Sequence, residues 1–80
     1  MERADIYTKL NGVFRDVFDD DSITVNDNTT ANDIEDWDSL EHINLVVAVE
    51  NCFKIKFNMG EVAALKNVGE MVDLISAKIN

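Results

Sequence analysis

The fold is decided by residues 37–53, WDSLEHINLVVAVENCF in one-letter code. Asp38 precedes Glu41 by three residues, which is the spacing of a capping box, and a strongly apolar run follows. We therefore expect a helix over residues 39–53 with Asp38 as its N-cap. Ser39 would lie exposed in the first helical turn, where the partial positive charge of a helix N-terminus favours a phosphate group. Ser39 is thus well placed to carry a covalent phosphate ester.

The apolar residues of this helix fall into two stripes at helical spacing. One stripe consists of His42, Leu45, Val46, Val49 and Phe53. The other consists of Leu40, Ile43 and Val47 and begins beside Ser39. Because only one face of a helix can point fully inward, we assign the first stripe to the core. We expect the second stripe to be a docking surface.

Upstream of this helix the sequence predicts another helix followed by a long loop. The first helix has one apolar stripe, formed by Ile6, Leu10, Val13, Phe14, Val17 and Phe18. Asp19-Asp20-Asp21-Ser22 should end it, and the Asp-, Asn- and Thr-rich segment up to Asp38 favours turns. A loop of about twenty residues needs its own anchors in a small domain. The candidate anchors are Ile23, Val25, Ile34 and Trp37.

Downstream, the capping-box spacing recurs twice. Asn58 with Glu61 precedes a short segment over residues 62–65, and Asn67 with Glu70 precedes the last helix. The core-facing stripe of that last helix is formed by Val68, Met71, Val72, Ile75 and Ile79. The predicted fold is all-α: a small four-helix bundle with three longer helices, one short third helix and a long first loop, forming one domain over residues 1–80.

Composition limits the class of function. The 80 residues include 16 acidic and 7 basic side chains, a net charge of −9, which argues against binding to nucleic acid or to anionic membranes and favours basic protein partners. Cys52 is the single cysteine, so it indicates neither an internal disulfide nor a cysteine-based metal cluster. We see no signal peptide and no stable membrane insertion, and expect a cytoplasmic monomer.

Residues 38–53, with the loop before them and the short and long helices after them, resemble an acyl carrier protein. Such proteins carry an Asp-Ser-Leu motif at the start of the second helix, which matches Asp38, Ser39 and Leu40. The resemblance implies that a phosphopantetheinyl transferase attaches phosphopantetheine to Ser39, and that its thiol carries acyl groups as thioesters. The protein would be a carrier and not an enzyme, and no metal is implied.

The resemblance also implies roles for neighbouring residues. Asp38 and Leu40 would lie beside the attachment serine, and Val62 and Leu65 would line the path of the arm. Partner enzymes with basic docking surfaces, which transfer or modify acyl groups, would contact a set formed by Leu40, Glu41, Ile43, Asn44, Val47 and Glu50. Independently of the resemblance, Leu, Ile, Val and Phe dominate the predicted core, so we expect a long acyl chain to be partly sheltered between the helices, near Leu45, Val49 or Val72.

Departures from the family pattern bear on the pathway. Asn44, Asn51 and Cys52 stand where acidic residues are frequent, Lys54 and Lys56 add positive charge, and Asp36-Trp37 replaces a Gly-containing dipeptide. We take these departures to favour a specialised acyl-transfer system over bulk fatty-acid synthesis. The cargo is open among fatty acyl, polyketide, hydroxyacyl and aminoacyl or peptidyl groups.

Three functions outside the carrier class are conceivable for these residues. Ser39 and His42 lie three residues apart, as in a hydrolase, but the sequence has neither a nucleophile-elbow glycine pattern nor an evident oxyanion hole. The acidic loop lacks the glycine of a calcium-binding EF-hand, because residues 19–41 contain no glycine. A helical interaction module without a cofactor would use the Leu40, Ile43 and Val47 stripe alone.

Overall fold

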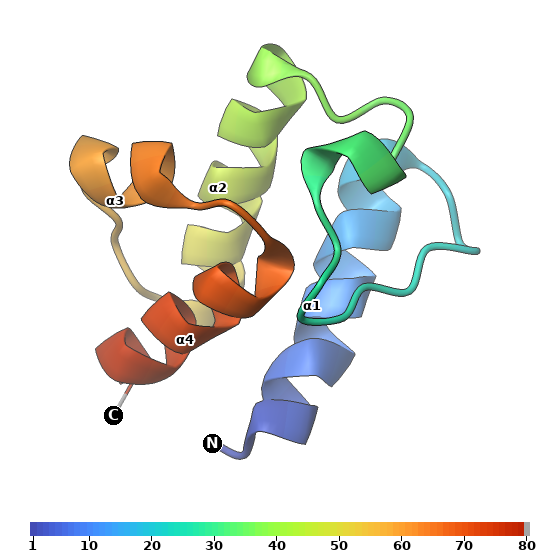
Figure 1. Cartoon of the computed structure of the whole chain (residues 1–80). Helices are drawn as coiled ribbons and strands as arrows, with labels where there is room; N and C mark the ends of the chain where they lie inside the picture. Colours follow the sequence, from blue (N-terminus) through green and yellow to red (C-terminus); the bar gives the residue numbers. More distant parts are fainter. Residues whose placement is uncertain (80) are drawn as a thin grey trace.

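The computed structural model describes residues 1–79 and is all-helical over that range (Figure 1). The four α-helices are α1 (Arg3–Phe18), α2 (Ser39–Phe53), α3 (Met59–Ala64) and α4 (Val68–Ile79). The predicted fold, with three longer helices and a short third one, is confirmed. A short 3-10 helix, η1 (Ala31–Asp33), lies within the long loop and was not predicted. None of the helices in residues 1–79 has the length and apolar character needed to cross a bilayer.

The start of α2 has one of the two hydrogen bonds of the expected capping box. The Asp38 carboxylate accepts a hydrogen bond of 2.8 Å from the Glu41 backbone N–H. The Asp38 N–H, however, donates to the Asp36 carbonyl, and the Glu41 carboxylate accepts from the Asn44 side chain. The reciprocal half of the predicted capping box is therefore absent, because both groups that would form it have nearer partners.

The caps of the last two helices also differ in detail from expectation. Asn58 and Glu61 form a full capping box, with bonds of 2.8 and 2.9 Å. Because the N-cap directly precedes the first helical residue, α3 begins at Met59 and not at residue 62 as predicted. At α4 the Asn67 side chain accepts from the Glu70 N–H, while the Glu70 carboxylate accepts from the N–H of Lys66.

The core lies where α1 packs against α2 and α4. The predicted stripes of α1 and α4 face this core. From the first stripe of α2, Leu45, Val49 and Phe53 join it, whereas Val46 is buried outside this cluster and His42 is only half-buried. The side chains that are fully buried are Ile6, Leu10, Phe14, Leu45, Val49, Val68, Met71, Val72 and Ile75. This packing leaves Leu40, Ile43 and Val47 of α2 exposed.

The long loop is held along α1 by the predicted anchors and by polar contacts. Val25 is buried, and Ile23, Ile34 and Trp37 pack against the core. The Asn11 side chain accepts a hydrogen bond of 2.7 Å from the Val25 N–H, and Arg15 donates one of 2.7 Å to the Ile23 carbonyl. The first half of the loop is therefore fixed by side chains of α1, which helps to explain how so long a connection stays ordered.

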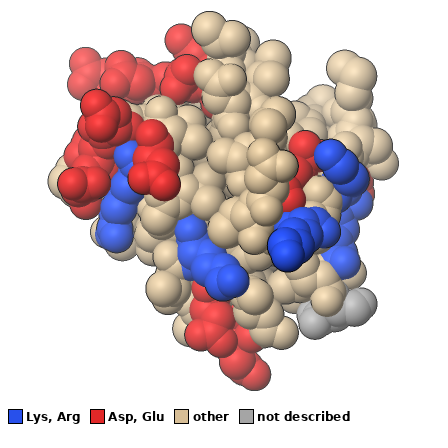
Figure 2. Space-filling model, turned by 180° about the vertical axis from the view of Figure 1, so that it is seen from behind, with Lys and Arg blue, Asp and Glu red and all other residues tan. Residues whose placement is uncertain are grey.

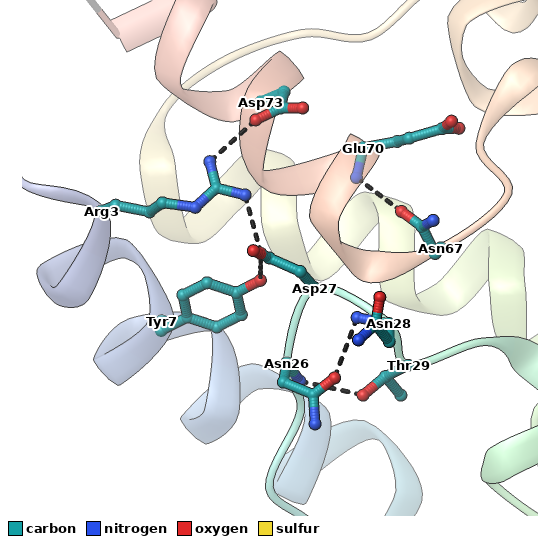
Figure 3. A network of polar contacts seen from close by, with 9 residues as sticks. All are labelled: Arg3, Tyr7, Asn26, Asp27, Asn28, Thr29, Asn67, Glu70 and Asp73. Carbon is teal, nitrogen blue, oxygen red and sulfur yellow. Dashed lines mark hydrogen bonds and ion pairs between the residues drawn. The ribbon is translucent and has the colours of Figure 1, made fainter.

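A polar network joins this loop to both ends of the fold (Figure 3). Arg3 donates to Asp27 at 2.7 Å and to Asp73 of α4 at 2.8 Å, and Tyr7 donates its hydroxyl hydrogen to Asp27. The hydrogen bonds from Tyr7 and Arg3 hold the pKa of Asp27 below its ordinary value. Burial and the bond to Asp27 raise the pKa of Tyr7 to about 12.

Backbone contacts support the same junction. The Val68 N–H donates to the Thr29 carbonyl at 2.8 Å, and the Gly69 N–H donates to the Asp27 carbonyl at 3.1 Å. This close approach requires glycine, because a Cβ on Gly69 would lie 2.8 Å from the Asp27 carbonyl oxygen. The first turn of α4 and the loop that leads to α2 are thus held together.

Candidate functional site

Ser39 is the first residue of α2 and is exposed. Its position follows from the Asp38 cap, which ends the loop in extended backbone and starts the helix at the next residue. The backbone N–H groups of a first helical turn favour an anion at this place. The hydroxyl is therefore accessible to an enzyme and lies where a phosphate ester would be stabilised.

An apolar cleft of about 850 Å³ opens beside Ser39. The cleft runs between α2, α3 and the segments that join α3 to its neighbours. Its apolar lining includes Trp37, Ile43, Val46, Val47, Phe57, Val62, Leu65 and Met71. Ser39 and the two α3-region residues singled out from the sequence, Val62 and Leu65, thus line one cleft. A flexible arm on Ser39 would fit here, because Ser39 itself lines the cleft and the cleft offers apolar walls.

The cleft does not include the residues expected to shelter an acyl chain. Leu45, Val49 and Val72 are fully buried in the core between α1, α2 and α4. They cannot contact a ligand without opening that core. The apolar surface that this structure exposes near Ser39 is the wall shared by α2 and the α3 region.

The second stripe of α2 is exposed. Leu40, Ile43 and Val47 expose 66%, 60% and 49% of their surface, unusually high values for three neighbouring apolar residues. On the face opposite to that of Figure 1, acidic side chains gather at the upper left, basic side chains lie mainly at the centre and right, and uncharged surface lies between them (Figure 2). Met59 at the start of α3 is 88% exposed and lines the cleft, which sequence periodicity did not indicate.

The polar residues of the expected docking set have internal partners. Glu41 accepts a hydrogen bond of 3.0 Å from the Asn44 side chain, one turn further along α2. Glu50 is half-buried and accepts a bond of 2.9 Å from the Phe57 N–H. Glu50 therefore secures the connection from α2 to α3, a role that sequence reasoning missed because the partner is a backbone group in a loop.

The short helix α3 is tied to the last turn of α4. Lys78 forms an ion pair of 3.0 Å with Glu61, and its ammonium group also lies over the Phe57 ring, 5.8 Å from the centroid. The backbone bond from Asn58 and the bond from Lys78 lower the pKa of Glu61. Since α3 has no buried residue, these contacts hold one wall of the cleft in place.

Trp37 and His42 form a further part of the site. The Trp37 indole Nε1–H donates to His42 Nδ1 at 3.1 Å, and the two rings stack with centroids 5.9 Å apart. Both residues line the cleft beside Ser39. The sequence placed His42 on the core-facing stripe, but Trp37 as its partner could not be read from helical spacing. Among residues 1–79, no group of three or more acidic, histidine or cysteine side chains is arranged to hold a metal ion.

Comparisons with known proteins agree with this geometry. The family described as "Phosphopantetheine attachment site" matches residues 8–75. An acyl carrier protein from Coprothermobacter proteolyticus is 28% identical over 81 residues, covering 99% of this chain and 96% of that protein. The solution NMR structure of a holo acyl carrier protein from Geobacter metallireducens has 52% identity and a TM-score of 0.86, covering 91% of this chain and 84% of that one. The chain therefore belongs to the acyl carrier protein family, whose members are carriers and not enzymes and hold a covalently attached phosphopantetheine.

Proposed function

We propose that Ser39 carries the phosphopantetheine arm and that the thiol of the arm holds acyl intermediates as thioesters. The observation that carries this proposal is the position of Ser39, which is exposed at the first turn of α2 and lines the apolar cleft. The group supplies the thiol that forms the thioester. The chain supplies the attachment point, the cap at Asp38 and the apolar walls at Val62 and Leu65.

The arm explains why a protein without catalytic groups of its own would be useful. A tethered acyl group is presented to each enzyme at a raised effective concentration. Once the carrier has docked, the encounter between the acyl group and the active site is intramolecular. Membership of the family implies interaction with a phosphopantetheinyl transferase and with acyl-handling enzymes. The chain then has to be recognised by several different enzymes through one surface.

We assign this surface to the exposed stripe of Leu40, Ile43 and Val47. Three exposed apolar residues beside the attachment serine provide a patch that an enzyme can desolvate on docking. Glu41, next to the stripe, would pair with basic residues of the partner and act mainly on encounter rate and specificity. Asn44 lies within bonding distance of Glu41 and orients its carboxylate. Glu50, held by the Phe57 N–H, would contribute mainly through the shape of the cleft.

The attachment is tested by intact-protein mass spectrometry after incubation with coenzyme A and a broad-specificity phosphopantetheinyl transferase. We expect a gain of one phosphopantetheinyl group in the wild type and in Ser22→Ala, and no gain in Ser39→Ala. Ser22 is a matched control because it is also an exposed serine. Loading of Ser39→Ala, or failure of a folded wild type to load with an active transferase, would contradict the proposal.

Docking is tested by the kinetics of the same transferase on Ile43→Ser and Val47→Ser. Loss of one docking contact should raise KM by roughly tenfold while kcat stays unchanged. The reason is that the contact stabilises the ground-state complex and the transition state equally. Both positions are exposed, so the fold should persist, which circular dichroism can confirm. An unchanged KM for both variants would show that the stripe is not the docking surface.

We further propose that the chain serves a specialised acyl-transfer system. The support is the composition of α2, where Asn44, Asn51 and Cys52 replace frequent acidic positions and are all exposed. Fewer carboxylates on this helix weaken attraction to strongly basic enzyme surfaces. Turnover by the enzymes of generic fatty-acid synthesis equal to that of their own carrier would count against this assignment.

A further inference from the structure

We propose that Trp37 and His42 act together to position the arm: Trp37 fixes the orientation and tautomer of His42, and the His42 Nε2–H donates a hydrogen bond to the phosphodiester on Ser39. His42 is thus a positioning residue for the attached group. The inference rests on the proposed attachment at Ser39. It assigns a role to two residues that the attachment chemistry alone does not require.

The tautomer follows from the contact between the two rings. The indole Nε1 of tryptophan can only donate a hydrogen bond, so His42 Nδ1, at 3.1 Å, must accept. An imidazole nitrogen that accepts carries no proton, and the proton of the neutral ring then resides on Nε2. A doubly protonated ring has no acceptor and could not make this contact.

The orientation of His42 is set by the aromatic packing of Trp37. Trp37 packs edge-on against Phe14, with ring centroids 5.4 Å apart, and against Phe18 at 6.1 Å. Phe14 is fully buried in the core. His42 stacks on Trp37 with an interplanar angle of 23°. The imidazole is therefore held by a side chain that is itself packed against α1.

The Nε2–H of His42 has no partner among residues 1–79 and is available for a ligand. His42 is half-buried and lines the same cleft as Ser39. The two residues are three positions apart on α2, so their side chains share a face, and helical side chains lean toward the N-terminus. The acceptor that the proposed attachment brings to this place is the phosphodiester, and a hydrogen bond to a charged oxygen is stronger than one between neutral groups.

The same tautomer bears on the hydrolase hypothesis. A histidine that activates a serine must offer it an unprotonated nitrogen. In His42 the unprotonated Nδ1 is occupied by Trp37, and Nε2 carries the proton. His42 can therefore donate to a group on Ser39 but cannot act as a general base toward the Ser39 hydroxyl.

The test uses ring-nitrogen NMR of the full chain in the apo form and after loading, together with phosphorus NMR of the loaded form. Trp37→Phe keeps an aromatic ring on Phe14 and Phe18 but removes the indole donor. His42→Asn keeps an acceptor near the position of Nδ1 but removes the distal N–H. Circular dichroism verifies that both variants are folded, and intact mass verifies loading before each spectrum.

In the apo wild type we expect the neutral His42 ring to carry its single proton on Nε2. In Trp37→Phe we expect a mixture of the two neutral tautomers of His42. Loading should slow solvent exchange of the Nε2–H by about tenfold, because the proton becomes bonded to a charged oxygen. The phosphorus resonance should shift between the wild type and His42→Asn. A merely structural role for His42 predicts neither change.

Two results would overturn the inference alone. The first is a proton on Nδ1 of His42 in the apo form. The second is a chain loaded at Ser39 in which the Nε2–H exchanges as fast as in the apo form and the phosphorus resonance equals that of loaded His42→Asn. A folded wild type that does not load at Ser39 would overturn the proposed attachment as well. The mass measurement separates these two kinds of failure.

Discussion

Gly69→Ala tests whether the loop before α2 is held against α4. The added Cβ would lie 2.8 Å from the Asp27 carbonyl oxygen and 3.1 Å from the Asp27 Cα. These are backbone atoms, so no flexible side chain can move aside. The loop has to shift, which weakens the hydrogen bond from the Gly69 N–H to the Asp27 carbonyl. The contacts of Asp27 with Arg3 and Tyr7 would be strained by the same shift.

The magnitude follows from opposing contributions. Overpacking costs about 1–3 kcal/mol, and a lost backbone hydrogen bond costs about 1 kcal/mol. Replacing a helical glycine by alanine recovers at most about 1 kcal/mol. The free energy of unfolding should therefore fall by roughly 1–3 kcal/mol, and each kcal/mol corresponds to about 4–8 °C in the melting temperature of a domain of this size.

Gly12→Ala is the matched control, because Gly12 lies inside α1 and a Cβ there meets no atom within 4 Å. The same substitution should raise the free energy of unfolding by about 0.5–1 kcal/mol. Urea unfolding followed by far-UV circular dichroism measures both variants. If Gly69→Ala were as stable as the wild type or more stable, the loop would not be held against α4 as described.

Three further predictions concern pH, cargo and salt. The folded-state pKa of Asp27 is lowered, so the stability that Asp27 contributes should be lost as pH falls below 3.8. The folded-state pKa of Tyr7 is raised, so the stability that Tyr7 contributes should be lost as pH rises from 10.0 to about 12. When the free energy of unfolding is plotted against pH, the loss at acid pH should be smaller in Asp27→Asn and the loss at alkaline pH smaller in Tyr7→Phe than in the wild type. Unchanged losses in both variants would contradict the network. In NMR spectra of an octanoyl-loaded form, Val62 and Leu65 should shift more than the buried Leu45, and the reverse order would place the chain in the core. The net charge of −9 should make the melting temperature rise with added magnesium or salt, whereas a flat response would show that acidic repulsion is unimportant.

Local patterns in the sequence predict much of the fold. The helix at 39–53 has the predicted bounds because a capping side chain and continuous apolar spacing both act within a few residues. The division of α2 into a buried and an exposed stripe is also local, since it depends only on helical geometry. The loop anchors Val25 and Trp37 follow from their apolar side chains in a polar segment.

Long-range contacts could not be predicted in the same way. Arg3 and Asp73 are 70 residues apart, and nothing in either neighbourhood indicates the other. The pairing of Trp37 with His42 depends on how α2 meets the preceding loop. The walls of the cleft could not be predicted in full for a similar reason. They depend on how α3 lies beside α2, and they combine Ile43 from the exposed stripe with Val46 from the core-facing stripe.

The central claim is that Ser39 is the residue to which the arm is attached. Trypsin, which cleaves after Lys and Arg, releases residues 16–54 as one peptide that contains both Ser22 and Ser39. Tandem mass spectrometry of this peptide after loading therefore has to assign the modification to one of two serines in the same spectrum. We predict that the fragment ions place the phosphopantetheinyl group on Ser39, whereas a group on Ser22, or a modified fragment outside this peptide, would contradict the account.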